Sequence, residues 1–141
     1  MGPPWVPTRS KDIDELLDDA KLASGQSFIE LGCGDGRLLA AARRRGAQAT
    51  GYEINPVMWL VATVRNLRYY PRVRVRLGNF WRRDLSGADV VMAFLVPRFM
   101  RRLEMKAKAE IKPGARLVSY IYALPAKRPK HQGRHWFVYK Y

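Results

Sequence analysis

The chain has 141 residues, of which 48% are hydrophobic, 11% are aromatic and one is a cysteine, and its formal net charge is +14. This composition excludes global disorder, and a lone cysteine excludes an intrachain disulfide framework. The longest apolar run, Val90 to Val96, is far shorter than the ~20 residues that span a bilayer. We therefore expect one domain over residues 1–141, located in the cytoplasm or peripherally at an anionic membrane surface.

The charge is unevenly distributed along the chain. Residues 1–53 carry 7 basic and 8 acidic side chains, a net charge of −1, whereas residues 54–141 carry 19 basic and 4 acidic side chains, a net charge of +15. Such asymmetry predicts an acidic or polyanionic partner for the second part of the chain. Nucleic acid, an anionic membrane surface and an acidic protein face all satisfy it.

The first third of the chain predicts an alternation of helices and strands. The expected elements are an extended arm (1–10), a helix (11–24), a strand (27–31), a glycine cluster (32–36), a helix (37–45) and a strand (47–54). Ser10 is the expected N-cap of the first helix, which carries acidic residues in its first turn. Ser24-Gly25 ends that helix.

The alternation continues to the C-terminus. The expected elements are a helix from Pro56 with apolar residues at helical spacing (Val57, Leu60, Val61, Val64, Leu67), a half-exposed edge strand (72–77), a central strand (88–95), a helix (97–111), a strand (116–122), a basic loop (124–133) and a last strand (134–141). The fold class is therefore α/β. Residues 27–122 would form a Rossmann-like, mostly parallel sheet with helices on both faces, followed by a shortened C-terminal part with an antiparallel last strand.

The cluster Gly32-Cys33-Gly34-Asp35-Gly36 lies between the first strand and a helix, where parallel sheets bind ligands. We expect Gly32 to allow a tight turn, and Gly34 and Gly36 to leave space for a ligand on the backbone. The dinucleotide fingerprint fails because residue 37 is arginine, and the Walker A loop fails because Leu38 stands where lysine is required.

Two carboxylates frame this cluster. Glu53 ends the second strand, 21 residues after Gly32, near the position from which a carboxylate accepts hydrogen bonds from ribose hydroxyls. Glu30 precedes the cluster and suits an ammonium group. Together they fit the ribose and amino-acid ends of S-adenosylmethionine.

These segments carry a family resemblance. Residues 28–37 and 51–56 resemble the first two motifs of class I (seven-β-strand) methyltransferases. More narrowly, residues 6–8, 78–85, 89–97 and 112–119 are similar to small protein-lysine methyltransferases related to the ATP synthase c-subunit lysine methyltransferase and an archaeal broad-specificity lysine methyltransferase. The resemblance covers nearly the whole chain, although the usual fifth helix and sixth strand have almost no room between residues 122 and 134.

The resemblance implies a set of cofactor-binding residues. They are Thr8, Glu30, Gly32, Gly34, Asp35, Gly36, Glu53, Ile54, Asn79 and Phe80. Asn79 stands where the family usually has aspartate, so we expect weakened rather than lost adenine binding. The end of the fourth strand faces the cofactor loop, so Phe94, Leu95 and Pro97 are the candidate acceptor channel. No general base and no metal site can be named.

Three functions are consistent with these observations. The first is methylation of protein lysine side chains, with a protein substrate that is acidic or membrane-adjacent. The second is methylation of RNA or another nucleic acid, which the basic half favours. However, residues 94–97 read Phe-Leu-Val-Pro, which lacks the Asp/Asn-Pro-Pro-aromatic tetrad of base-amine methyltransferases. The third is a non-catalytic nucleic-acid-binding module with a methyltransferase fold.

Three further side chains with reactive or titratable groups receive simpler interpretations. Cys33 is expected to be a packing residue because no partner base is evident. His131 and His135 are expected to lie on the surface.

Overall fold

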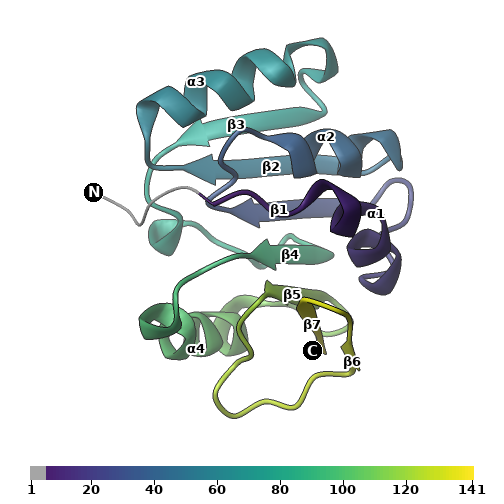
Figure 1. Ribbon diagram of the computed structural model, residues 1–141, viewed down its shortest axis with the longest axis vertical. Coiled ribbons are helices and arrows are strands. Elements are labelled where there is room, and N and C mark those ends of the chain that lie inside the picture. The colour runs from purple at the N-terminus through teal and green to yellow at the C-terminus, as the bar shows by residue number, and fades with distance from the viewer. Residues whose placement is uncertain (1–5) are drawn as a thin grey trace.

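A computed structural model describes residues 6–141, so residues 1–5 of the expected arm lie outside the described part (Figure 1). The elements are α1 (Ser10–Asp19), β1 (Ser27–Leu31), α2 (Arg37–Arg44), β2 (Gln48–Glu53), α3 (Pro56–Arg65), β3 (Val73–Leu77), β4 (Val90–Ala93), α4 (Met100–Glu110), β5 (Arg116–Tyr120), β6 (His131–Gln132) and β7 (Trp136–Lys140). Short 3-10 helices cover Leu67–Tyr69, Phe80–Arg82 and Pro97–Phe99.

The strands form one sheet in the order β3-β2-β1-β4-β5-β7-β6. The pairs among β3, β2, β1, β4 and β5 are parallel, whereas β7 runs antiparallel to β5 and to β6. The predicted α/β class, the edge position of β3 and the antiparallel last strand are therefore confirmed.

Helices cover both faces of the sheet, as predicted. One core joins α1 and α2 to strand residues such as Phe28, Ala49 and Val118, and α3 contributes Ala62 to it. The other core joins α4, through Leu103 and Ala107, to the opposite face. Strand residues that alternate between the two faces, such as Phe28 and Ile29, therefore belong to different cores.

The first helix is shorter than predicted. It covers Ser10–Asp19 rather than residues 11–24, and the capping position is Arg9, which makes no side-chain cap, so Ser10 is not the N-cap. The helix cannot continue through Lys21, whose φ is +54°. Asp12 is an acidic residue of the first turn, as predicted for this helix, and its side chain is fully buried against the C-terminal hairpin.

The C-terminal part also differs from the prediction. The expected loop over 124–133 contains β6, so the sheet retains a sixth strand of two residues. His135 is not a free surface group, because its Nδ1 lies 2.7 Å from Oδ2 of Asp12 and its ring stacks on Tyr120. His131 Nε2 lies 3.0 Å from Oδ2 of Asp19. Both histidines therefore connect the C-terminal hairpin to α1.

Candidate active site

A cavity of about 670 Å³ opens at the carboxyl ends of β1, β2 and β4. Eight predicted cofactor residues line it: Thr8, Glu30, Gly32, Asp35, Glu53, Ile54, Asn79 and Phe80. The cavity also takes in residues that the sequence did not single out, including Pro7, Arg37, Met58, Trp81, Phe99 and Arg102. The carboxyl ends of these neighbouring parallel strands lie at the same edge of the sheet, so side chains that are far apart in sequence come together there.

Glu53 joins the glycine cluster to the end of β2. Its Oε1 accepts a hydrogen bond from the Gly34 amide at 2.9 Å, and its Oε2 accepts one from the Asn55 amide at 2.9 Å. Each carboxylate oxygen keeps further acceptor capacity. Glu53 can therefore hold the loop in place and still receive ribose hydroxyls.

Glu30 presents a buried carboxyl group with an unused oxygen. Its side chain is only 7% exposed, and Oε1 has no hydrogen-bond partner among the described residues. Burial raises its pKa well above the usual value, and the nearby charges of Asp35 and Glu53 raise it further. A buried acceptor of this kind is costly unless a ligand satisfies it. An ammonium group placed in the cavity fits it, so the residues present suit the amino-acid end of S-adenosylmethionine.

The three glycines do not share one role. Gly32 is exposed in the cavity lining, and a Cβ built on it meets nothing within 4 Å. Gly36 is different, because a Cβ there would lie 2.6 Å from Nδ2 of Asn66 and 3.0 Å from Cβ of Ala62. The structure therefore gives Gly36 a role in packing between helices. Its missing side chain lets α3 approach the start of α2. Gly34 is buried, lies outside the cavity lining and contributes its amide to Glu53.

Asp35 is held by two arginines. Its Oδ2 lies 2.8 Å from Nη2 of Arg37 and 3.5 Å from Nη2 of Arg65. Burial opposes ionisation, but the hydrogen bonds from Arg37 and the charges of Arg37 and Arg65 leave the pKa of Asp35 below its usual value. Asp35 is therefore ionised at neutral pH and fixes the loop against α2 and α3.

The other end of the cavity is apolar and aromatic. Ile54 is half exposed there, and Phe80 packs on Trp81 with ring centroids 4.7 Å apart. Arg102 lies over the Trp81 ring at 4.3 Å. Asn79 Oδ1 already accepts a hydrogen bond from the Trp81 amide, so only its remaining lone pair is available for an adenine amine.

The candidate acceptor channel is partly assembled. Phe94 and Leu95 line the cavity, and Phe94 stacks on Tyr120 with centroids 4.9 Å apart. Pro97 was also expected in the channel, but it is exposed and lies outside the lining, because the chain turns into a 3-10 helix there. The Phe99 side chain, two residues further on, lines the cavity instead.

The remaining candidates for a reactive group are the thiol of Cys33 and clusters of side chains that could bind a metal ion. Cys33 lines the cavity, but its side chain is buried, and burial together with the charges of Glu30 and Glu53 raises the pKa of its thiol well above the usual value. The thiol is therefore protonated and unreactive at neutral pH. Over residues 6–141, no group of three His, Cys, Asp or Glu side chains is placed to hold a metal ion.

Comparison with known proteins identifies the family. The model of the ANTKMT methyltransferase domain matches residues 30–131. A protein-lysine N-methyltransferase of Saccharolobus islandicus is 34% identical over 131 residues, which cover 90% of this chain and 81% of that protein. The human ATP synthase c-subunit lysine N-methyltransferase is 32% identical over 91% of this chain, but the chain spans only 55% of that protein.

A solved structure supports the methyltransferase fold and its cofactor. The RNA methyltransferase of Salinibacter ruber in complex with S-adenosyl-L-homocysteine superposes with a TM-score of 0.92 and 26% identity, covering 96% of this chain and 93% of that chain. The bound S-adenosyl-L-homocysteine is the demethylated form of the cofactor predicted from the glycine cluster, Glu30 and Glu53. The chain belongs to the ANTKMT methyltransferase domain family and is an S-adenosylmethionine-dependent methyltransferase.

Proposed function

We propose that the protein methylates the ε-amino group of lysine side chains in protein substrates. The observation that carries this choice is the apolar end of β4, where Phe94 and Leu95 line the cavity beside the aromatic rings of Trp81 and Phe99. An aliphatic lysine stem suits such a lining better than a base edge, which needs polar partners. The names of the curated relatives in the preceding section support the same acceptor.

The same geometry supports the cofactor-binding roles that the family resemblance implies. Glu30 would receive the amino group, Glu53 would receive the ribose hydroxyls, and Gly32 would leave room for the amino-acid end. Ile54, Asn79 and Phe80 would surround the adenine, with Thr8 and Asp35 completing the wall. When bound, S-adenosylmethionine supplies a methyl group on a sulfonium centre.

The chain contributes mainly position and desolvation. Alignment of the two reacting groups can contribute about 7–11 kcal/mol. Removing the proton from a lysine side chain at pH 7 costs roughly 4.6 kcal/mol, given its usual pKa of about 10.4. The apolar wall of Phe94, Leu95 and Phe99 disfavours the ammonium form and so reduces this cost.

The charge distribution supports a proposal for the acceptor surface and for the location of this protein. Residues 54–141 carry a net charge of +15 and include the β4 end and the C-terminal hairpin. We infer that the acceptor presents an acidic surface. We also infer that this protein acts in the cytoplasm beside an anionic membrane, and that residues 1–141 form one domain. Electrostatic attraction of this kind mainly accelerates encounter.

Labelling tests the acceptor class. The protein is incubated with a cell lysate and S-adenosylmethionine that carries a radiolabelled methyl group, and the product is digested with protease or nuclease. The proposal predicts label that protease releases and nuclease does not. Label that survives protease but not nuclease would mean that RNA is the acceptor, as in the name of the Salinibacter ruber protein.

A further inference from the structure

The outward face of α3, together with the 3-10 turn that follows it, is an aliphatic stripe, called here the α3 stripe. Five side chains at spacings of three and four residues are 42–68% exposed: Val57, Leu60, Val61, Val64 and Leu67. The inward face presents Ala62, which is fully buried against Gly36, and the half-buried Trp59, whose Nε1 donates a hydrogen bond to the Val75 carbonyl of β3. In an ordinary surface helix most large apolar residues face the core, whereas these five face outward. The stripe is larger and more regular than isolated exposed apolar residues, so it indicates an interaction surface.

The chain segment that carries this stripe is rich in arginine. From residue 54 to residue 83 the chain carries seven arginines, no lysine and no acidic residue. All seven are exposed, and the ion pairs given by the described residues include only Arg65 among them. Arg68 and Arg74 lie over the rings of Tyr69 and Tyr70. An apolar stripe in an arginine-rich segment that contains no acidic residue suits a partner that is both apolar and anionic.

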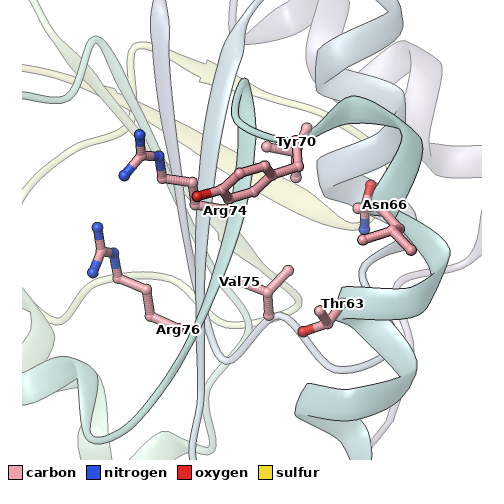
Figure 2. Close-up of a pocket in the computed structure, with 8 residues that line it drawn as sticks. Thr63, Asn66, Tyr70, Arg74, Val75 and Arg76 are labelled. Atoms are coloured by element: carbon pink, nitrogen blue, oxygen red, sulfur yellow. The ribbon is translucent and has the colours of Figure 1, made fainter.

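The arginines of β3 lie around the sheet edge from the stripe. Figure 2 shows the guanidinium groups of Arg74 and Arg76 pointing away from α3, while Tyr70 and Thr63 border the hollow between α3 and β3. That hollow has a volume of about 220 Å³, and Asn66, which also lines it, has a buried Oδ1 with no partner among the described residues. The cations and polar groups can therefore lie at headgroup level when the aliphatic stripe enters the acyl boundary.

We propose that the α3 stripe and the arginines of this segment bind an anionic lipid bilayer. In Figure 1, α3 lies along the upper edge of the sheet beside β3, at the outside of the molecule. An exposed helix face in this position can enter a fluid bilayer without a complementary groove. A second copy of the chain fits poorly, because a two-fold contact through the stripe would oppose two sets of arginines in a chain of net charge +14.

This placement sets the orientation of the active-site cavity. Ile54 lines the cavity and is half exposed, and the stripe begins three residues later at Val57. The cavity mouth therefore opens beside the bilayer, at the level of its surface. The consequence that acceptor lysines lie close to a membrane surface rests on the proposed function, whereas bilayer binding itself does not.

Vesicle sedimentation with the full chain tests the proposal. Binding to vesicles of phosphatidylcholine and phosphatidylglycerol is compared with binding to pure phosphatidylcholine. We expect binding to the anionic vesicles only, reduced by salt, and at least about 10-fold weaker for the double variant Leu60→Gln/Val64→Gln, since less apolar area enters the bilayer. The matched control is Met105→Gln, whose side chain is 66% exposed on α4 and should bind as the parent protein does.

Three outcomes would overturn the proposal. One is no binding to anionic vesicles. Another is equal binding by Leu60→Gln/Val64→Gln and the parent, which would reduce the interaction to charge alone. The third is a dimer in sedimentation equilibrium that this double variant abolishes, which would assign the stripe to a second copy. Because the assay contains neither cofactor nor acceptor, and because methylation of a soluble acceptor can be measured separately, its failure is distinguishable from failure of the proposed function.

Discussion

Oε1 of Glu53, at the end of β2, accepts a hydrogen bond from the amide of Gly34 at 2.9 Å. Oε2, the other carboxylate oxygen of Glu53, accepts a hydrogen bond from the backbone amide of Asn55. The Asn55 side chain caps α3, because its Oδ1 accepts hydrogen bonds from the amides of Val57 and Met58. One side chain therefore connects the glycine loop, β2 and the start of α3. The cavity wall is held in position before any ligand binds, which reduces the ordering cost of binding.

Replacing Glu53 with alanine should weaken S-adenosylmethionine binding by about 1–3 kcal/mol, because acceptors for two backbone amides and for the ribose are lost. Isothermal titration calorimetry measures this directly. Glu53→Gln is the matched control, because it keeps one acceptor oxygen and should lose less affinity. An unchanged affinity in Glu53→Ala would refute the ribose role.

Replacing Glu30 with glutamine should have opposite effects on stability and on binding. Burial raises the pKa of Glu30 in the folded state. At a pH between the unfolded and the folded pKa, the folded protein therefore keeps the Glu30 proton, whereas the unfolded chain has released it. Stability therefore falls as pH rises through this interval, and Glu30→Gln should melt at a higher temperature than the parent at neutral pH without cofactor. The difference should vanish in acid, below the unfolded pKa.

The same substitution should weaken cofactor binding by about 1.5–3 kcal/mol, the usual value of a hydrogen bond to a charged group. In the parent protein, binding of a cationic ligand should release a proton from Glu30, which calorimetry in buffers of different ionisation enthalpy detects. Equal proton release by the parent and Glu30→Gln would contradict this assignment.

Gly36→Ala should destabilise the protein more than Gly32→Ala. Both glycines have positive φ, +79° and +74°, so each alanine variant bears a conformational cost of roughly 1–2 kcal/mol. Only the Gly36 variant also places a Cβ 2.6 Å from Nδ2 of Asn66. Urea unfolding compares their free energies of unfolding, and cofactor titration should show the larger affinity loss in Gly32→Ala. If the two variants are equally stable, Gly36 does not serve α2–α3 packing.

Asp12→Asn should destabilise the protein by about 1.5–3 kcal/mol at neutral pH, because Asp12 accepts hydrogen bonds from Tyr120 and His135 and pairs with Arg134. Burial acts to raise the pKa of Asp12, but these partners lower it more, so the pKa of Asp12 lies below its usual value. Their contribution is therefore complete above the unfolded pKa and is lost as pH falls through the folded pKa. The stability gap measured by urea unfolding should narrow in acid, and a gap independent of pH would contradict the ionic role.

The sequence predicts the features that depend on neighbours along the chain. The alternation of arginine and apolar residues over 72–77 predicts an edge strand, and the apolar run over 88–95 predicts a central strand. Both predictions are possible because the local pattern of apolar residues indicates which faces of a strand are buried. Sheet geometry places the glycine cluster, Glu30 and Glu53 at one edge, and the family resemblance that they support adds Thr8, Ile54, Asn79 and Phe80, which also line the cavity.

Features that depend on distant partners could not be predicted in this way. Asp12 meets His135 across 123 residues, so a first-turn acidic residue gives no sign that it is buried. Gly36 meets Asn66 across 30 residues, so spacing alone could not distinguish a glycine that faces α3 from one that faces a ligand. The orientation of the α3 stripe is likewise set by Ala62 and Gly36 rather than by the period of its aliphatic residues.

The most direct test of the central claim identifies the methylated residue. A protein acceptor is incubated with the purified protein and radiolabelled S-adenosylmethionine, then hydrolysed completely, and the labelled amino acid is identified by chromatography and mass spectrometry. The account predicts label in methylated lysine, with little transfer by Glu53→Ala at low cofactor concentration. Label confined to another amino acid, or transfer to nucleic acid alone, would contradict it.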